Sequence, residues 1–210
     1  MNKDLTDITL IVDRSGSMTS CREEAQNGIN HFIKAQKETP GKATLTLVQF
    51  DTEYEFVHNG KPINEVGDFS LVPRGMTALL DSVGRAINEA GKRIESLPED
   101  QRPGLVVFGI TTDGQENASH EFTRAKIKEM IEHQRSVYNW QFTFLGANQD
   151  AFLEAASLGI AATATANFST KNSEVAYAAM SNSVSRSRMS ASVGGAVNMS
   201  YTADEKKGMK

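Results

Sequence analysis

Short apolar runs alternate along the chain with segments whose apolar residues recur every three or four positions. The runs that predict strands are 8–12, 43–50, 54–58, 105–110, 142–146 and, more weakly marked, 160–168. Helical spacing marks the stripes Ala25-Ile29-Phe32-Ile33 and Leu80-Val83-Ile87-Ala90-Ile94, and the segments 121–134 and 151–158. This alternation predicts one α/β domain over 1–168, with a doubly wound, mainly parallel central sheet and helices on both faces.

Three local signals refine this prediction. The run 54–58 follows 43–50 so closely that we expect the two strands to pair as a hairpin, which gives the sheet an antiparallel edge strand. Asn59-Gly60 predicts the next turn. The pattern Ser20-Cys21-Arg22-Glu23 predicts a capping box at the start of the first helix.

The composition changes from Ser169 onward, where Ser, Ala, Asn and Met become frequent. The apolar stripe over 174–184 is poor, so this segment predicts only a weak helix. We therefore expect 169–210 to be a C-terminal appendage, partly helical or flexible, with a frayed end over 204–210.

Composition excludes several classes of protein. The chain has 210 residues, 39% of them hydrophobic and 23% charged, with a formal net charge of -4 and no basic cluster. We therefore expect no nucleic-acid partner. No apolar run is long enough to cross a bilayer, and the start of the chain does not resemble a secretory signal, so we expect no membrane partner. The single cysteine, Cys21, suits a reducing compartment. These features predict a cytoplasmic protein and leave its oligomeric state open.

Polar residues follow two of the predicted strands. Asp13, Ser15 and Ser17 come directly after the first strand, and Asp113 follows the strongest strand signal of the chain. Thr77 opens the helix between them. In the strand order 3-2-1-4-5-6, strands one and four flank the point where the order reverses, so these groups are expected to share one crevice.

Two carboxylates and three hydroxyls form an all-oxygen donor set, which is typical of a Mg2+ site. Mn2+ accepts the same donors, and Ca2+ is a further candidate, although it more often takes several carboxylates. Because hydroxyls are neutral, they leave the charge of the ion only partly offset. Such an ion attracts an outside anion, and a carboxylate from a partner protein fits it well.

The residues around these positions resemble a known family. Asp13-Arg14-Ser15-Gly16-Ser17-Met18, Gly75-Met76-Thr77-Ala78-Leu79 and Thr112-Asp113-Gly114 resemble the metal-ion-dependent adhesion site of von Willebrand factor type A (vWA) domains. The resemblance covers about 7–168. The segments 113–119 and 144–148 are most similar to intracellular bacterial and phage members.

The resemblance implies a Rossmann-like vWA fold and a role for each site residue. Ser15 and Ser17 would bind the metal directly, as would Thr77 in the ligand-competent state. Asp13 and Asp113 would act mainly through water. It also implies a non-catalytic function, in which the domain binds a protein partner that supplies an Asp or Glu carboxylate to the metal.

Nearby polar residues have other expected roles. We expect Asp81 to orient a loop through hydrogen bonds and Asp51 to be a turn residue, neither of them a ligand. Arg14 and Arg74 either contact a partner or are solvated loop charges. The four histidines are scattered without metal-ligand spacing.

Two other functions remain open at this stage. The first is a structural or assembly protein that interacts through 169–210, with the metal only stabilising the loops. The second is a Mg2+-dependent phosphatase with Asp13 as nucleophile. The chain resembles the phosphatase family at Asp13 alone. The second acidic residue of that family falls at the position of Ser15, and the loops that would meet Asp13 contain no lysine like the family's. No nucleophile elbow, Walker loop or dinucleotide fingerprint occurs, so we expect no enzyme activity.

Overall fold

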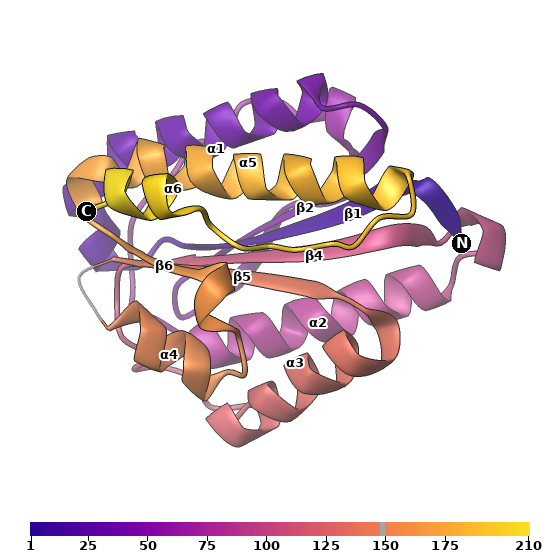
Figure 1. The fold of residues 1–210 in the computed structure, drawn as a ribbon. Helices are drawn as coiled ribbons and strands as arrows, with labels where there is room; N and C mark the ends of the chain where they lie inside the picture. The colour runs from indigo at the N-terminus through magenta and orange to yellow at the C-terminus, as the bar shows by residue number, and fades with distance from the viewer. Residues whose placement is uncertain (148–149) are drawn as a thin grey trace.

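The computed structural model describes residues 1–147 and 150–210, which leaves Asn148 of the resemblance outside the described part. Its centre is a six-stranded sheet with the order β3-β2-β1-β4-β5-β6, counted over the described residues (Figure 1). The strands are β1 (Asn2–Asp13), β2 (Lys42–Phe50), β3 (Tyr54–Pro62), β4 (Pro103–Thr112), β5 (Gln141–Ala147) and β6 (Thr165–Phe168).

The predicted sheet is confirmed. β1 runs parallel to both β2 and β4, β5 continues the parallel order to β6, and β3 pairs antiparallel with β2 at the edge. The middle strands are buried on both faces, which is why their sequences read as continuous apolar runs. The chain order reverses between β1 and β4, so the polar residues that follow these strands lie on one edge of the sheet.

Helices cover both faces of the sheet, as predicted (Figure 1). On one face lie α1 (Arg22–Glu38) and α5 (Ser173–Ser192), which pack side by side. On the other lie α2 (Leu79–Glu95) and α3 (Arg124–Tyr138), with α4 (Ala151–Ser157) near β5 and β6. The short α6 (Ala203–Gly208) packs against α5 near the C-terminus.

The turn predicted at Asn59-Gly60 is wrong, because β3 continues through it to Pro62. The register between β2 and β3 shifts at this point, with Leu45 opposite Lys61 but Leu47 opposite His58. Gly60 has a φ of 61° and donates its N–H to Thr46 Oγ1 at 2.9 Å. A left-handed glycine therefore makes a bulge inside the strand in place of a turn after it.

The predicted capping box of the first helix is also absent. A 3-10 helix, Gly16–Cys21, comes first, and α1 begins at Arg22 without a side-chain cap. The hydroxyl of Ser20 instead donates to the carbonyl of Ser17 at 3.2 Å. The extra turn follows directly from the loop after β1, so that loop, and not a cap, fixes where α1 begins.

The segment after Ser169 packs against the sheet. Tyr177, Met180 and Val184 of α5 are fully buried and belong to the same hydrophobic core as the strands. A Cβ built on Gly28 of α1 would lie 2.7 Å from the ring of Tyr177, so only glycine lets α1 and α5 approach this closely. The boundary at 168/169 stays a prediction, and truncation at that point tests it.

The C-terminal end is ordered, contrary to the frayed end predicted for 204–210. Thr202 and Glu205 form a reciprocal capping box at the start of α6, and the carbonyl of Met209 accepts a hydrogen bond from Ser169 N at 2.8 Å. Arg186 pairs with Glu205. Arg188 is 3% exposed and donates to carbonyls at the end of α1, Gln36 among them at 2.8 Å.

No helix in the described part of the chain is both long enough and apolar enough to cross a membrane.

Candidate metal centre

Three loops meet beyond the carboxyl ends of β1 and β4. The loop after β1 and the loop before α2 are joined by backbone hydrogen bonds, from Gly16 N to Gly75 O at 3.1 Å and from Arg74 N to Arg14 O at 2.7 Å. The third loop follows β4, and a side-chain contact ties it to the first. The topology predicted from the sequence therefore brings all three loops to one place.

The side chains of these loops form a continuous polar chain. Asp13 Oδ2 accepts a hydrogen bond from Thr112 Oγ1 at 2.6 Å, and Asp13 Oδ1 accepts one from Ser15 N at 2.7 Å. Ser15 Oγ and Ser17 Oγ are 3.0 Å apart, and Ser17 Oγ donates to Asp113 Oδ1 at 2.6 Å. Two carboxylates and two hydroxyls from residues about a hundred positions apart are thus in direct contact.

Gly114 lies against the same donors and extends the cluster to the third loop. A Cβ built on Gly114 would lie 3.0 Å from Thr77 Oγ1, 3.4 Å from Ser17 Oγ and 3.8 Å from Asp13 Oδ2. Oxygen atoms of the first two loops therefore face Gly114 of the third loop, at a point where an added methyl group would crowd them.

Both carboxylates are buried and lack a cationic partner. Burial raises the pKa of Asp13 to about 6, although hydrogen bonds from Thr112 and Ser15 favour its charged form, and the charge of Asp113 raises this pKa further. Burial also raises the pKa of Asp113, against a hydrogen bond from Ser17 that lowers it. Among the described residues no arginine or lysine forms a salt bridge with either acid, and two buried, neighbouring acids of this kind are electrostatically suited to a bound cation.

The structure brings together all five predicted site residues: Asp13, Ser15, Ser17, Thr77 and Asp113. In the described part of the chain, no group of three or more His, Cys, Asp or Glu side chains could hold a metal ion. A metal at this centre thus depends on hydroxyl oxygens, as the sequence predicts. The donor set fits Mg2+, and the role of each residue as a ligand stays a prediction.

A buried ion-pair network locks the first two loops together. Asp51 Oδ2 accepts from Arg14 Nε at 3.0 Å and from Arg74 Nε at 2.8 Å, while Asp51 Oδ1 accepts from Glu53 N at 2.6 Å. Burial opposes the charge of Asp51, but these donors hold its pKa below the usual value. Arg14 also pairs with Glu55 and is 4% exposed. Asp51 follows β2, where a turn residue was predicted, and it also accepts hydrogen bonds from both arginines. The buried Arg14 side chain is neither a solvated loop charge nor accessible to a partner.

The start of α2 is capped by the loop after β4. Thr77 is not the N-cap, since its N–H donates to Asn117 Oδ1 at 2.9 Å and α2 begins at Leu79. The N–H of Leu80 donates to Glu116 Oε2 at 2.9 Å. The hydroxyl of Thr77 is therefore left for the metal centre. Sequence reasoning assigned no role to Glu116 and Asn117, and the density of polar residues over 113–119 is the signal that could have found them.

Asp81 holds the loop after β4, as predicted. Its Oδ1 accepts from the N–H groups of Glu121 and Phe122, both at 2.9 Å, and its Oδ2 accepts from His120 N at 2.8 Å. Burial alone raises the pKa of a carboxyl group, but here the three N–H groups and Arg85 outweigh it and lower the pKa of Asp81.

Replacing Asp81 with asparagine is expected to destabilise the protein by about 1–3 kcal/mol at pH 7, because one acceptor oxygen becomes an amide that faces an N–H group. The pKa of Asp81 is lower in the folded state, so its charge stabilises the fold above the ordinary carboxyl pKa of about 4 and ceases to do so as the pH falls below it. Urea unfolding of both proteins at several pH values measures this. A difference that stays constant down to pH 2 contradicts it.

Comparison with known proteins gives a structural match only. No family model and no curated protein matches the sequence. Proximal thread matrix protein 1 from the mussel byssus superposes with a TM-score of 0.61 at 16% identity, over 89% of this chain and 46% of that one. A von Willebrand factor type A protein from Catenulispora acidiphila gives a TM-score of 0.57 at 16% identity, over 88% of this chain and 42% of that one. The chain thus spans less than half the length of either protein.

The vWF domain of the type V pili tip protein Mfa5 from Porphyromonas gingivalis matches along nearly its whole length, 95% of this chain and 98% of that one. The TM-score is 0.60 at 12% identity. One structure of the mussel protein has zinc in its MIDAS motif, the metal-ion-dependent adhesion site. At these identities the likeness shows that the chain has the vWA fold.

Proposed function

We propose that the chain is a Mg2+-dependent protein-binding module that captures a carboxylate of a partner and carries out no catalysis. One observation carries this proposal. Two buried carboxylates and three hydroxyls cluster next to Gly114, and no arginine or lysine among the described residues forms a salt bridge with either acid. A bound divalent ion offsets that charge, and hydroxyl ligands leave the ion electrophilic.

The five proposed metal-binding residues are of two chemical kinds. Ser15, Ser17 and Thr77 supply neutral oxygens, and Asp13 and Asp113 supply charge through the hydrogen-bonded chain that links them to these hydroxyls. When bound, the ion offers a coordination position to an outside oxygen. A carboxylate is the ligand that best completes such a shell, because only two of the five donor groups are charged.

The choice of Mg2+ rests on the donor set. All five residues donate oxygen, whereas zinc sites in proteins usually contain Cys or His. The zinc-occupied MIDAS motif of the mussel protein supports a divalent ion in this fold. Titrating Mg2+, Mn2+ and Ca2+ into the same protein ranks the candidates directly.

The geometry disfavours a phosphatase. Asp13 is fully buried, and both of its oxygens already accept hydrogen bonds, from Thr112 and from the N–H of Ser15. A nucleophile needs a free oxygen within reach of a phosphorus atom. Loss of phosphoester turnover in Asp13→Asn, if turnover occurs at all, would restore the enzyme hypothesis.

Isothermal titration with Mg2+ tests the first half of the proposal. Wild type is expected to bind one ion, whereas Asp13→Ala and Thr77→Ala are expected to lose binding and keep the wild-type circular dichroism spectrum. Asp68→Ala is the matched control, because Asp68 is exposed on a neighbouring loop. Equal Mg2+ affinity in wild type and Asp13→Ala contradicts the proposal.

Affinity capture tests the second half. A partner retained by wild type is expected to be released by a chelator and to be absent with Asp13→Ala. Changing its contacting Asp or Glu to Asn or Gln is expected to abolish retention. Capture that survives both chelation and Asp13→Ala but fails in Val193→Ser, at an 83% exposed position after α5, supports assembly through the C-terminal segment instead.

A further inference from the structure

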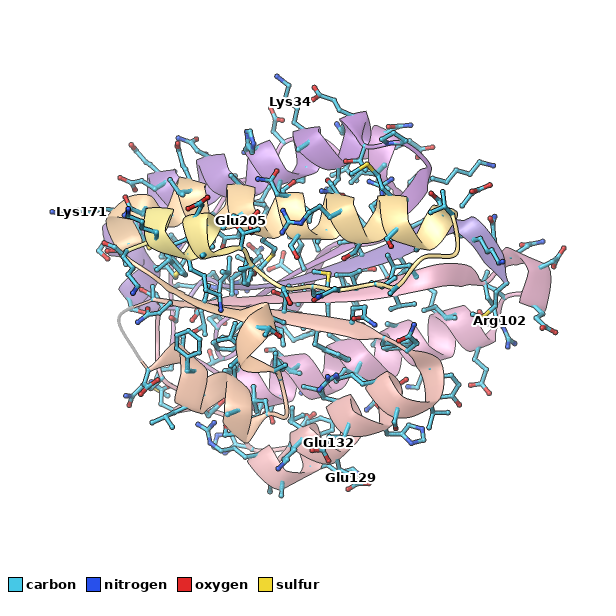
Figure 2. The ribbon with its side chains drawn as sticks, viewed as in Figure 1. Lys34, Arg102, Glu129, Glu132, Lys171 and Glu205 are labelled. Atoms are coloured by element: carbon cyan, nitrogen blue, oxygen red, sulfur yellow. The ribbon has the colours of Figure 1, made fainter. Side chains whose placement is uncertain are left out.

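A cavity of about 390 Å³ lies at the edge of the sheet opposite the metal centre. It is bordered by the ends of α2 and α3, the start of β4 and the residue that precedes β5. Figure 2 places Arg102, one of its lining residues, at the end of the molecule far from Lys171 and the carboxyl ends of the strands. The volume falls within the range of small-molecule sites.

One wall of the cavity is formed by Trp140, which two further aromatic rings support from behind. Trp140 lines the cavity, is 6% exposed and stacks on Phe108, with ring centroids 5.4 Å apart and an interplanar angle of 14°. Phe108 stacks in turn on Phe142 at 5.0 Å. Ile94 and Val106 add aliphatic surface to the lining. This wall is rigid and apolar, which favours a ligand with a ring or a branched hydrocarbon body.

A positioned cation borders the same cavity. Arg102 Nε donates to Leu97 O at 3.0 Å, and its Nη2 donates to Glu95 O at 2.9 Å. These two carbonyls fix the guanidinium but do not neutralise it, and no carboxylate among the described residues forms a salt bridge with it. The carboxylate of Glu95 also borders the cavity, but its side chain is exposed to solvent. The half-buried Arg102 is therefore the stronger electrostatic feature of the wall.

A helical glycine borders the cavity and has open space beside it. Within helices, Gly28 and Gly84 are explained by packing, since a Cβ on either would lie 2.7 Å from an aromatic ring. Gly91 of α2 has no such neighbour: a Cβ there would meet nothing within 4 Å, and the residue lines the cavity. Glycine inside a helix costs about 1 kcal/mol relative to alanine. Packing does not explain this glycine, and a larger side chain at this position would enter the cavity.

We propose that this cavity binds a small apolar carboxylate, whose hydrocarbon body lies against Trp140 and whose charge pairs with Arg102. The anion follows from the fixed guanidinium, and the apolar body follows from the stacked wall. The site shares no residue with the metal centre, so it is independent of the proposed Mg2+ function.

Trp140 is the only tryptophan of the chain, so the tryptophan fluorescence comes from a residue that lines this cavity. The probe is 3-phenylpropionate, which does not absorb where tryptophan is excited selectively. Its titration is expected to change the Trp140 emission saturably and to raise the melting temperature. The neutral 3-phenylpropionamide and the cationic phenethylamine are the matched comparisons, and both are expected to bind at least about tenfold more weakly, the size of one charge-assisted contact.

Two variants separate binding from folding. Gly91→Leu fills the cavity from the helix side and is expected to abolish the response, while Gly91→Ala keeps it and melts at a higher temperature. Arg102→Gln is expected to bind the carboxylate and the amide equally, a loss of charge preference that a merely structural role of Arg102 does not produce.

Three results overturn the proposal. One is a carboxylate response that Gly91→Leu leaves unchanged. Another is binding of the amide or the amine at least as tightly as the carboxylate in wild type. The third is no change in either fluorescence or melting temperature up to the solubility limit of the probe.

Discussion

Gly114→Ala is expected to weaken Mg2+ binding about 100-fold without removing a single proposed ligand. The added methyl group would stand 3.0 Å from Thr77 Oγ1 and 3.4 Å from Ser17 Oγ, against two of the proposed donor oxygens. Disturbing the surroundings of a metal typically costs 10–100-fold in affinity, and we expect about the upper end of that range here. Isothermal titration with Mg2+ measures the loss.

The matched control for this experiment is Gly67→Ala. A Cβ at Gly67 meets nothing within 4 Å, so the same chemical change is made where it fills no space. Gly67→Ala is expected to bind Mg2+ like wild type, and both variants are expected to stay folded. If Gly114→Ala binds the ion with wild-type affinity, the donors around Gly114 do not hold it, and the proposed metal centre is wrong.

Deleting 169–210 is expected to leave a chain that does not fold. Tyr177, Met180 and Val184 of α5 are fully buried against the sheet and α1. Truncating a single buried large apolar side chain costs about 2–5 kcal/mol, and a whole domain is stable by only about 5–15 kcal/mol. Expression of 1–168, followed by solubility and thermal denaturation, measures the effect.

This result bears on how the C-terminal segment is assigned. A 1–168 fragment that is soluble and unfolds cooperatively shows that the predicted boundary divides a domain from an appendage. An insoluble fragment shows that α5 is part of the domain. Tests of assembly through this segment therefore need substitutions at exposed positions such as Val193, because deletion removes part of the core as well.

The sheet could be predicted from the sequence because its physical signal is local. A strand buried on both faces needs an unbroken apolar run, and runs such as 105–110 meet that need. The metal centre could be predicted for a related reason. Four of its five residues follow the two strands that flank the reversal in the common doubly wound strand order, so their convergence follows from topology.

The C-terminal helix could not be predicted in the same way. Amphipathic periodicity marks a helix with one buried face, but α5 packs against α1, against the sheet and against the segment near Met199. It buries serines, including Ser181, whose hydroxyl and carbonyl both accept from Gln36 Nε2. Small residues allow this close approach, and they make the sequence look like a linker.

The ion pairs around Asp51 could not be predicted from the sequence, for a different reason. Nothing local in Arg14 or Arg74 shows that both guanidinium groups turn to one buried carboxylate at the end of another strand. Only the three-dimensional arrangement of the loops shows this. The polar sequence around the metal centre therefore predicted the cluster, and the contacts that hold its loops in place had to be observed.

The ion-pair network around Asp51 also determines whether this centre can be transferred to another protein. A protein engineer who moved only the loop after β1 and the loop before α2 onto another sheet of this kind would transfer the oxygen donors without their clamp. The graft must include Asp51 with both arginines, because the buried Asp51 carboxylate binds one arginine from each loop. The smallest transplantable unit is therefore the set of donors together with this internal brace.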